Sequence, residues 1–388
     1  MYDVIVAGGG PVGSSAARFC AERGLKTLLI EEHSDFGRPV QCAGLLSSNA
    51  FFECSVSDKS VLNEVSGAKV VSGKGSELLF DAKKTMAYVV DRSALDFEMA
   101  KKAAKSGVFI KVKTSVTGFC GNEVMTSGAN GRESFKCRMV IAADGPRSIF
   151  SRILNMKRAE LFLSGIQAEI STDIPKNIVE LHPYASPEFF GWVIPSQKGF
   201  ARVGLCGERD VFERFMRFIK PYNSSCVHLV SGTIPLGIMP KTYGSRVLFC
   251  GDAAGFAKPT SGGGVYTGIR TAFHAAETAL KCCESGRFSD SDLADYEKRW
   301  KADIGGELSA GMALYKMRQK VSDERIDALC RCMNNPKILD DIVKYGDMDR
   351  PQALIKKLFY KPCVIRALGG ILGDGLLSLL PGPAELKK

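Results

Sequence analysis

The chain opens with the stretch YDVIVAGGGPVG, residues 2–13, and this stretch decides the fold. Tyr2–Ala7 is a short apolar run that ends in glycines, which is typical of a buried parallel strand. Pro11–Arg23 predicts a helix, and Gly24 fits its C-cap because glycine tolerates the left-handed conformation. Thr27–Ile30 is a second apolar strand. Together they form a β-α-β unit, so the expected fold class is α/β with a Rossmann-type N-terminal domain.

The glycines of this stretch fit a nucleotide site. Gly8 permits a tight turn, Gly10 lets the backbone approach a pyrophosphate, and Gly13 lets the helix pack close to the strand. The first helical turn, which includes Val12, presents free N–H groups and a positive dipole end to the phosphates. Glu31 ends the second strand about 20 positions further on, where a carboxylate accepts hydrogen bonds from a ribose diol. Taken alone, the glycines also fit a turn without a ligand, and the whole unit fits NAD or FAD.

Two later segments favour FAD. The stretches AADGPRS, residues 142–148, and FCGDAAG, residues 249–255, each follow a short apolar strand. They resemble the second and third fingerprints of the flavoprotein hydroxylase superfamily, and this resemblance implies that Asp252 binds the ribityl hydroxyls of FAD. The triple glycine 262–264 opens the next helix, whose N-terminus stabilises negative charge on a reduced flavin. The residues expected to contact FAD there are Gly263, Gly264 and Val265.

Three local sequences narrow the family. They are RPVQCAG at residues 38–44, FGWVIP at residues 190–195 and GDAAGFAKPTSGGG at residues 251–264. Together they resemble the archaeal geranylgeranyl reductase family, specifically the reductases of digeranylgeranylglycerophospholipids, from residue 1 to about 305. The resemblance implies FAD-dependent hydrogenation of C=C bonds in the geranylgeranyl chains of archaeal ether-lipid precursors such as digeranylgeranylglyceryl phosphate.

The resemblance also implies further cofactor contacts. The loop Cys42-Ala43-Gly44 is expected at the flavin, although it is shorter than the Cys-Gly-Glu-Gly of some members. Arg92 is expected to contact FAD, and the backbone around Val116 is expected to face the adenine. An inert buried thiol is the alternative for Cys42.

The substrate residues that the resemblance implies are Phe190, Trp192, Ile194 and Pro195. The family motif is aromatic-x-Trp-x-Phe-Pro, with a tyrosine as the usual first aromatic. Here Phe190 replaces that tyrosine and Ile194 replaces the phenylalanine, which makes the expected site more apolar. Trp192 as an ordinary core residue is the alternative.

The expected reaction adds a proton to the less substituted carbon of an isolated alkene and a hydride to the more substituted one. Positive charge then develops at the tertiary carbon, and an aromatic face such as Trp192 would stabilise it by about 1–2 kcal/mol. Cys42 is the first candidate for positioning the flavin or delivering the proton, and Tyr266 is the competing proton donor.

The domain organisation follows from the distribution of these motifs along 388 residues. Residues 160–245 alternate and carry many turn signals, which predicts a β-rich unit. The expected division is an FAD-binding domain formed by residues 1–60, 88–155 and 245–290, a β-rich substrate domain formed by residues 61–87 and 156–244, and a C-terminal helical region formed by residues 291–388.

The composition limits the classes of partner and cofactor that we expect. The formal net charge is +10, which fits a solvated surface, an acidic protein or an anionic membrane, and no nucleic-acid motif accompanies it. A low-potential electron donor is needed, and an acidic ferredoxin would suit a basic surface. The 13 cysteines are expected as reduced cytosolic thiols, and the 4 histidines form no ligand cluster, so no metal is expected.

No signal peptide and no spanning helix are expected, so the predicted location is cytoplasmic, at the inner face of the membrane where the lipid lies. Lys356–Pro381 places basic residues before apolar ones, which suits a helix in the membrane interface. A helix packed on the protein's own core is the alternative.

Two other function classes fit the same fold. One is an FAD-dependent aromatic monooxygenase, and the other is a non-catalytic protein for flavin electron transfer or membrane docking.

Overall fold

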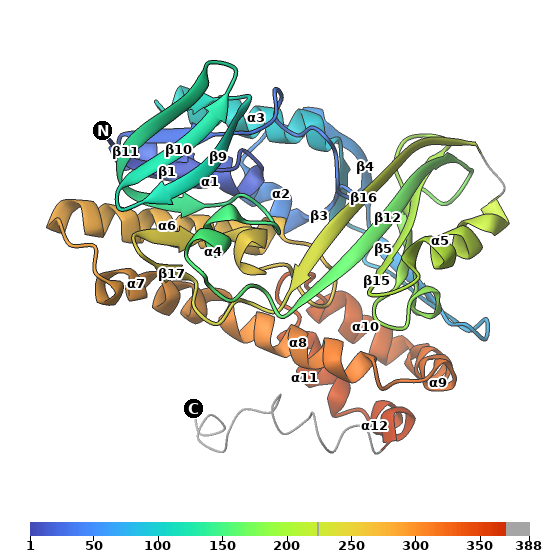
Figure 1. The fold of residues 1–388 in the computed structure, drawn as a ribbon. Coiled ribbons are helices and arrows are strands. Elements are labelled where there is room, and N and C mark those ends of the chain that lie inside the picture. Colours follow the sequence, from blue (N-terminus) through green and yellow to red (C-terminus); the bar gives the residue numbers. More distant parts are fainter. Residues whose placement is uncertain (223–224, 370–388) are drawn as a thin grey trace.

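The structure is a computed structural model that describes residues 1–222 and 225–369. Its strands form an eight-stranded, a seven-stranded and a three-stranded sheet, and Figure 1 shows the first at the left and the second at the right. The strands are β1 Tyr2–Ala7, β2 Thr27–Ile30, β3 Leu45–Ser47, β4 Val61–Val65, β5 Gly67–Val71, β6 Glu77–Asp81, β7 Ala87–Val90, β8 Phe109–Lys111, β9 Thr114–Cys120, β10 Glu123–Gly128, β11 Gly131–Ala142, β12 Leu161–Ser171, β13 Ile178–His182, β14 Gly191–Pro195, β15 Phe200–Gly207, β16 Cys226–Leu236, β17 Tyr243–Gly244 and β18 Val247–Phe249.

The helices lie around these sheets and extend below them in Figure 1. They are α1 Pro11–Glu22, α2 Ser48–Cys54, α3 Arg92–Lys105, α4 Ile149–Ile153, α5 Val211–Ile219, α6 Val265–Ser285, α7 Asp290–Trp300, α8 Gly306–Arg318, α9 Asp323–Met333, α10 Pro336–Tyr345, α11 Gln352–Phe359 and α12 Pro362–Leu368. A π-helical turn, Lys301–Gly305, joins α7 to α8.

The first sheet brings the ends of its parallel strands to one edge. Six of its strands lie in the order β17-β18-β11-β1-β2-β8, in which every pair except β17–β18 is parallel, and β10 pairs antiparallel with β11 and with β9. Ala7 at the end of β1 pairs with Ile30 and with Ala142, and Ala142 pairs with Phe249. Ligands of open α/β sheets bind outside such carboxyl ends, so the segments that leave these strands are placed to build a common site.

The β-α-β unit is confirmed. β1 and β2 have the predicted bounds, and α1 ends at Glu22, one residue before the predicted Arg23. Gly24 has a φ of +82°, the left-handed conformation expected of it. Helix α1 packs against α3 and α6. Its buried face includes the small residues Ala16 and Ala17, which let the helix lie close to the sheet.

The second sheet has helix α5 on one face, while Ala257 and Tyr315 pack on the other. Its order is β16-β12-β15-β14-β13-β5-β6, antiparallel except for the β13–β5 pair. Phe215 and Phe218 of α5 pack on Ala168, Val203 and Leu205. The expected β-rich unit is therefore present, with α5 added to it.

The C-terminal helices pack beneath the second sheet. Leu78 of β6 joins a core with Ile326, Val364 and Leu368. The predicted single interfacial helix over Lys356–Pro381 differs from the structure, because α11 ends at Phe359 and α12 begins at Pro362.

Val364 and Leu368 are 4% and 3% exposed, so these residues pack on the protein's own core, as the alternative for this segment required. Residues 370–381 of that segment lie outside the described residues. Within residues 1–222 and 225–369, no helix has the length and apolarity needed to cross a bilayer.

Candidate functional site

The glycines after β1 form a cradle at the start of α1. Gly8 has a φ of +94°, a conformation that L side chains rarely adopt. A Cβ on Gly13 would lie 1.8 Å from the carbonyl oxygen of Gly8, whereas a Cβ on Gly10 would meet nothing within 4 Å. Gly10 is the N-cap of α1 and carries no capping side chain. The cradle is therefore tight on its inner side and open on the side where a phosphate would approach the helix N-terminus.

Glu31 fixes this cradle from the neighbouring strand. It is 7% exposed, and its Oε2 accepts a hydrogen bond of 2.6 Å from the Gly9 N–H. Its Oε1 accepts from the backbone N–H of His33 at 2.8 Å and lies 2.7 Å from His33 Nδ1. A carboxylate has about four lone-pair positions, so Glu31 retains acceptor capacity for a ribose hydroxyl while it holds the glycine turn.

Val116 lies close to Glu31 in the sheet. It belongs to β9 and packs against the main core. The N–H of Thr114, at the start of β9, donates to the Glu31 carbonyl oxygen at 2.9 Å. The end of β2 and the start of β9 are therefore joined, which brings both predicted nucleotide contacts to one region.

The carboxylate of Asp252 faces the triple glycine. A Cβ on Gly264 would lie 2.7 Å from Asp252 Oδ1, so only glycine fits there. Burial raises the pKa of Asp252 to about 6, against the opposing effect of Arg92. No residue of the described chain donates a hydrogen bond to this carboxylate. A partly buried acceptor without a donor fits a ligand that brings hydroxyl groups of its own.

Arg92 and Cys42 meet below the second sheet. Nε and Nη2 of Arg92 donate to Asp96 at 3.0 and 2.8 Å. Burial by itself would lower the pKa of Arg92, but Asp96 and Cys42 together raise it above its ordinary value. The N–H of Gly44 donates to Cys42 Sγ at 3.3 Å. The flavin loop, residues 38–48, is thus anchored at its cysteine and lies against the start of α3.

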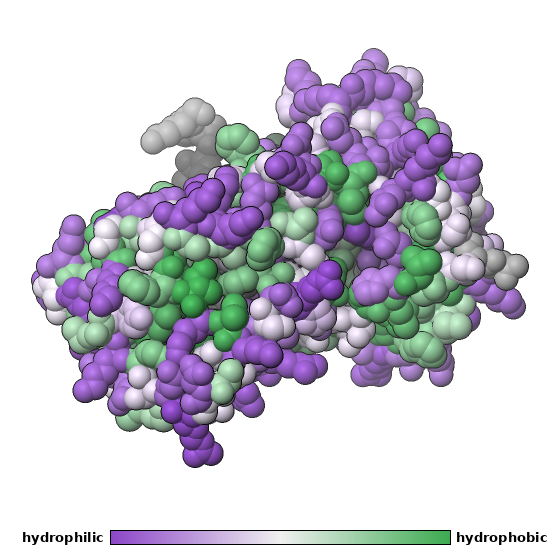
Figure 2. Space-filling view, turned by 90° about the horizontal axis from the view of Figure 1, so that it is seen from above, coloured by the Kyte–Doolittle hydropathy of each residue, from purple (hydrophilic) through white to green (hydrophobic). Residues whose placement is uncertain are grey.

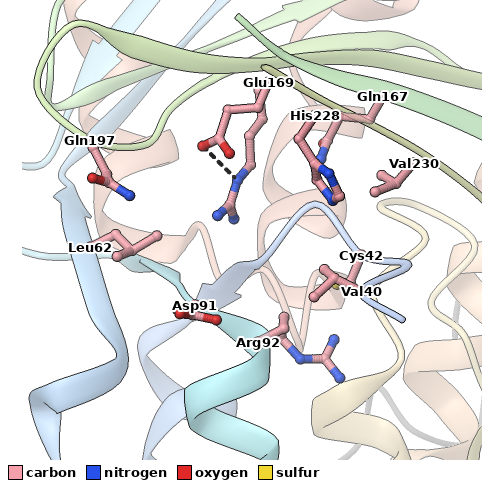
Figure 3. Close-up of a pocket in the computed structure, with 11 residues that line it drawn as sticks. Val40, Cys42, Leu62, Asp91, Arg92, Gln167, Glu169, Gln197, His228 and Val230 are labelled. Carbon is pink, nitrogen blue, oxygen red and sulfur yellow. Dashed lines mark ion pairs between the residues drawn. The ribbon is translucent and has the colours of Figure 1, made fainter. Parts of the chain in front are cut away.

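A cavity of about 180 Å³ lies above this loop, as Figure 3 shows. The flavin loop and the start of α3 form its lower wall, with Cys42 and Arg92, and the second sheet forms its upper wall, with Gln167 and His228. The other lining residues are Val40, Leu62, Asp91, Glu169, Gln197, Arg202 and Val230. Cys42 therefore lines a cavity and is only partly buried.

The aromatic residues predicted for substrate lie next to this cavity. Phe189 and Phe190 stack with centroids 4.2 Å apart, and Phe190 meets Trp192 edge-on at 6.4 Å. Trp192 Nε1 donates to Gln167 Oε1 at 2.8 Å, and Gln167 lines the cavity. Trp192 is only partly buried, so the alternative of an ordinary core residue does not describe it fully.

Ile194 and Pro195 lie further along β14 and do not line the cavity. Ile194 is 3% exposed and packs with Val65, Val89 and Val179. The carbonyl oxygen of Pro195 accepts a hydrogen bond from Asn63 Nδ2 at 3.1 Å. None of the four motif residues lines the cavity. Trp192 reaches its wall through Gln167 and Phe190 contacts Trp192, whereas Ile194 packs within the sheet.

Tyr266 also lies apart from the cavity. It is 6% exposed, and its hydroxyl accepts a hydrogen bond from Arg350 Nε at 3.2 Å. Burial raises its pKa, while Arg350 acts in the opposite direction. Arg350 also donates to Asp303 Oδ1 at 2.8 Å, so Tyr266 is tied to the C-terminal region.

Three polar residues near the site, Arg202, Asp144 and Lys258, were not predicted from the sequence. Arg202 donates from Nη1 to the carbonyl oxygens of Ala43 and Val90, at 2.8 and 3.1 Å, and nothing in an alternating strand distinguishes it. Asp144 belongs to the AADGPRS fingerprint, and its buried Oδ1 has no hydrogen-bond partner among the described residues, so that fingerprint was the available signal. Lys258 forms a buried ion pair of 2.6 Å with Asp349, and Ser47 donates to the same carboxylate at 2.5 Å.

Comparison with known proteins decides the family. A family described as FAD binding domain matches residues 1–222. Digeranylgeranylglycerophospholipid reductase 2 of Methanothermobacter thermautotrophicus is 30% identical, over 96% of this chain and 100% of that protein. The digeranylgeranylglycerophospholipid reductase of Methanocaldococcus jannaschii is also 30% identical, over 89% of this chain and 94% of that protein. The chain belongs to the digeranylgeranylglycerophospholipid reductase family.

A solved structure of the same kind matches this fold. The geranylgeranyl bacteriochlorophyll reductase-like protein of Thermoplasma acidophilum has a TM-score of 0.85 and 26% identity, over 98% of this chain and 99% of that one. Membership of the reductase family makes the chain a flavin-dependent oxidoreductase with FAD as its cofactor.

The geometry fits FAD. The open glycine cradle suits its pyrophosphate, Glu31 its ribose and the donor-less Asp252 its ribityl hydroxyls.

Proposed function

We propose that the chain hydrogenates geranylgeranyl C=C bonds of an archaeal ether-lipid precursor such as digeranylgeranylglyceryl phosphate. The observation that carries this proposal is the junction of the cavity with the aromatic group. Gln167 lines the cavity beside Cys42 and holds Trp192 by a hydrogen bond of 2.8 Å. A thiol thus lines the cavity while an indole is held at its wall, so the thiol could protonate an alkene there and the indole could stabilise the cation that forms.

The residues of the chain supply the proton and hold the alkene, while FAD in its reduced form supplies the hydride. Cys42 Sγ accepts the Gly44 N–H, which leaves the S–H free to donate into the cavity. Tyr266 Oη accepts from Arg350 and does not line the cavity. Cys42 is therefore the preferred proton donor of the two.

The aromatic group stabilises the charge that develops on the substrate. Protonation of a trisubstituted alkene leaves positive charge on the tertiary carbon, and the faces of Phe190 and Trp192 interact favourably with a cation. Such a contact contributes about 1–2 kcal/mol once water is excluded. Cation stabilisation of this kind does not need a carbonyl group on the substrate, and the isoprenoid chain has none next to its alkenes.

The electron donor and the location belong to the same proposal. The net charge of +10 suits a low-potential acidic ferredoxin, whose association it would steer. The lipid substrate places the enzyme on the cytoplasmic side, at the inner face of the membrane. No nucleic acid takes part.

Single-turnover reduction tests the proposal. The FAD-loaded protein is reduced with dithionite, mixed with digeranylgeranylglyceryl phosphate without oxygen, and the lipid is analysed by mass spectrometry. We expect products heavier by two hydrogen atoms for each reduced bond. Fast NADPH oxidation with oxygen uptake and no change in the lipid would instead indicate the aromatic monooxygenase. A flavin that cycles without changing any alkene would indicate an electron-transfer protein.

A further inference from the structure

Three segments converge at one end of the second sheet. The N–H of Ser171, the last residue of β12, donates to the Ser225 carbonyl oxygen just before β16 at 3.3 Å. The N–H of Thr172 donates to the Gly199 carbonyl oxygen at 3.0 Å, in the turn between β14 and β15. The start of the edge strand β16 therefore lies beside these two loops, at the upper right of Figure 1.

Apolar side chains are exposed at this end. Val227 and Leu229 of β16 are 60% and 54% exposed, and Met216 of α5 is 50% exposed. Leu229 pairs with Ala168 of β12, and directly paired residues point to the same face of a sheet. Since Ala168 packs beneath α5, Leu229 lies on the same side of the sheet as α5. Val227 stands at the register shift opposite Glu169 and Ile170 and is exposed on the edge strand.

Basic side chains accompany them. Lys198, Arg217 and Lys220 are exposed, and none forms an ion pair with another described residue. Arg214 differs, because it pairs with Glu188 at 2.5 Å. Glu213 is an exposed acid on the same helix, so the charge of this surface is mixed with an excess of cations near the tip of the sheet.

The other face of the same strand lines the cavity. His228 and Val230 alternate with Val227 and Leu229, and both line the cavity beside Cys42. Gln197, the neighbour of Lys198, lines it as well. Figure 3 shows Gln197 and His228 on the cavity's upper wall. In Figure 2, hydrophobic and hydrophilic atoms are interspersed over the second sheet at the right.

We propose that this end of the second sheet docks on an anionic lipid bilayer. The docking face consists of Lys198, Met216, Arg217, Lys220, Val227 and Leu229. Unpaired cations beside exposed apolar side chains complement anionic headgroups above acyl chains. The proposal rests on the proposed function, because a lipid taken from the bilayer here would enter the cavity past the edge strand that lines it.

Flotation of the full-length, FAD-loaded protein tests the docking face. The vesicles contain phosphatidylglycerol and phosphatidylcholine in equal parts, and pure phosphatidylcholine vesicles serve for comparison. Each basic side chain near an anionic surface strengthens binding by about fivefold. We therefore expect the Arg217→Gln/Lys220→Gln variant to bind the anionic vesicles about 25-fold more weakly, and Val227→Ser/Leu229→Ser to weaken binding to both vesicle types.

Matched variants on the first sheet and α3 provide the controls. Arg132→Gln/Lys136→Gln removes two exposed cations from β11, and Phe97→Ser/Met125→Ser removes two exposed apolar side chains from α3 and β10. Both should float like the wild type. All variants should keep wild-type rates on detergent-dispersed lipid, and the docking-face variants should lose rate only on vesicle-embedded lipid.

The proposal is overturned if the wild type stays unbound, or if the controls lose as much binding as the docking-face variants. It is also overturned if Val227→Ser/Leu229→Ser changes only the sedimentation coefficient, because a second copy of the chain would then cover the face. A protein that floats as expected but reduces no alkene would contradict the proposed function and leave the docking face standing.

Discussion

At the scale of single residues, Asp252 is expected to affect both the affinity for FAD and the stability of the apoprotein. We expect Asp252→Asn to bind FAD at least tenfold more weakly, because hydrogen bonds to a charged acceptor contribute about 1.5–3 kcal/mol. Equilibrium titration followed by flavin fluorescence measures this. Asp3→Asn is the control. Asp3 lies near the start of β1, at the end of the first sheet away from the glycine loop, so this variant should keep wild-type affinity.

The same substitution has a pH signature. Burial raises the pKa of Asp252 from 3.8 to about 6, so the folded apoprotein holds a proton that the unfolded chain releases. Stability is therefore greatest below about pH 4 for this group and falls as the pH rises through 6. Thermal unfolding of the apoprotein should show that Asp252→Asn removes this fall. Identical pH profiles for the two proteins would contradict the raised pKa.

Cys42 carries the proposed proton transfer. We expect Cys42→Ala to keep its FAD and to reduce alkenes about 100-fold more slowly, since a positioned acid contributes at least that factor. Tyr266→Phe removes the competing hydroxyl and should retain the wild-type rate. Rapid-quench kinetics on dithionite-reduced protein measures both. If Cys42→Ala and Cys42→Ser both keep full rates, the cysteine is not the proton donor.

At the scale of elements, the turn between β1 and α1 separates packing from ligand approach. Gly13→Ala would place a Cβ 1.8 Å from the Gly8 carbonyl oxygen, so we expect unfolding to become easier by about 3 kcal/mol or more. Gly10→Ala meets nothing within 4 Å and should stay folded while it loses FAD. Circular dichroism melting and flavin content distinguish the two effects, and equal melting temperatures would contradict them.

The buried pair of Lys258 and Asp349 joins the triple-glycine turn to the C-terminal region. Their side chains are 9% and 0% exposed. We expect Lys258→Met to destabilise the fold by about 3–5 kcal/mol, because it leaves a buried charge without its partner. Lys258→Met/Asp349→Leu removes both charges and should recover much of that loss in denaturant titrations. A double variant as unstable as the single one would argue against the pair.

The sequence predicted elements well where periodicity and glycines agree. The strand Thr27–Ile30 has the predicted bounds, and the helix predicted over Pro11–Arg23 is α1, Pro11–Glu22. The prediction of one interfacial helix after Lys356 failed, because apolar spacing alone does not say whether Val364 and Leu368 contact lipid or protein. Contacts such as Arg202 with Ala43 join positions 159 apart, and no local pattern records them.

At the scale of the whole molecule, the 13 free cysteines form distinct reactivity classes. Cys120 and Cys226 are exposed, whereas burial raises the pKa of Cys54 and of Cys250 to about 12. We expect a maleimide to label Cys120 and Cys226 within minutes and the buried thiols only after unfolding. Mass spectrometry of peptides identifies the sites. Removal of FAD should speed the labelling of Cys42, and an unchanged rate would place the cofactor elsewhere.

The order of strands in the first sheet also determines how late in synthesis the sheet can be completed. Residues of β1 and β2 leave the ribosome first, but β11 and β18, which complete the parallel edge, follow more than a hundred and two hundred positions later. At about 5–20 residues per second, the glycine loop is made roughly 12–48 s before β18 and Asp252, which follows β18 closely. Cofactor loading is therefore a late event in the life of the nascent chain, and chaperones meet an unfinished sheet before any flavin can bind.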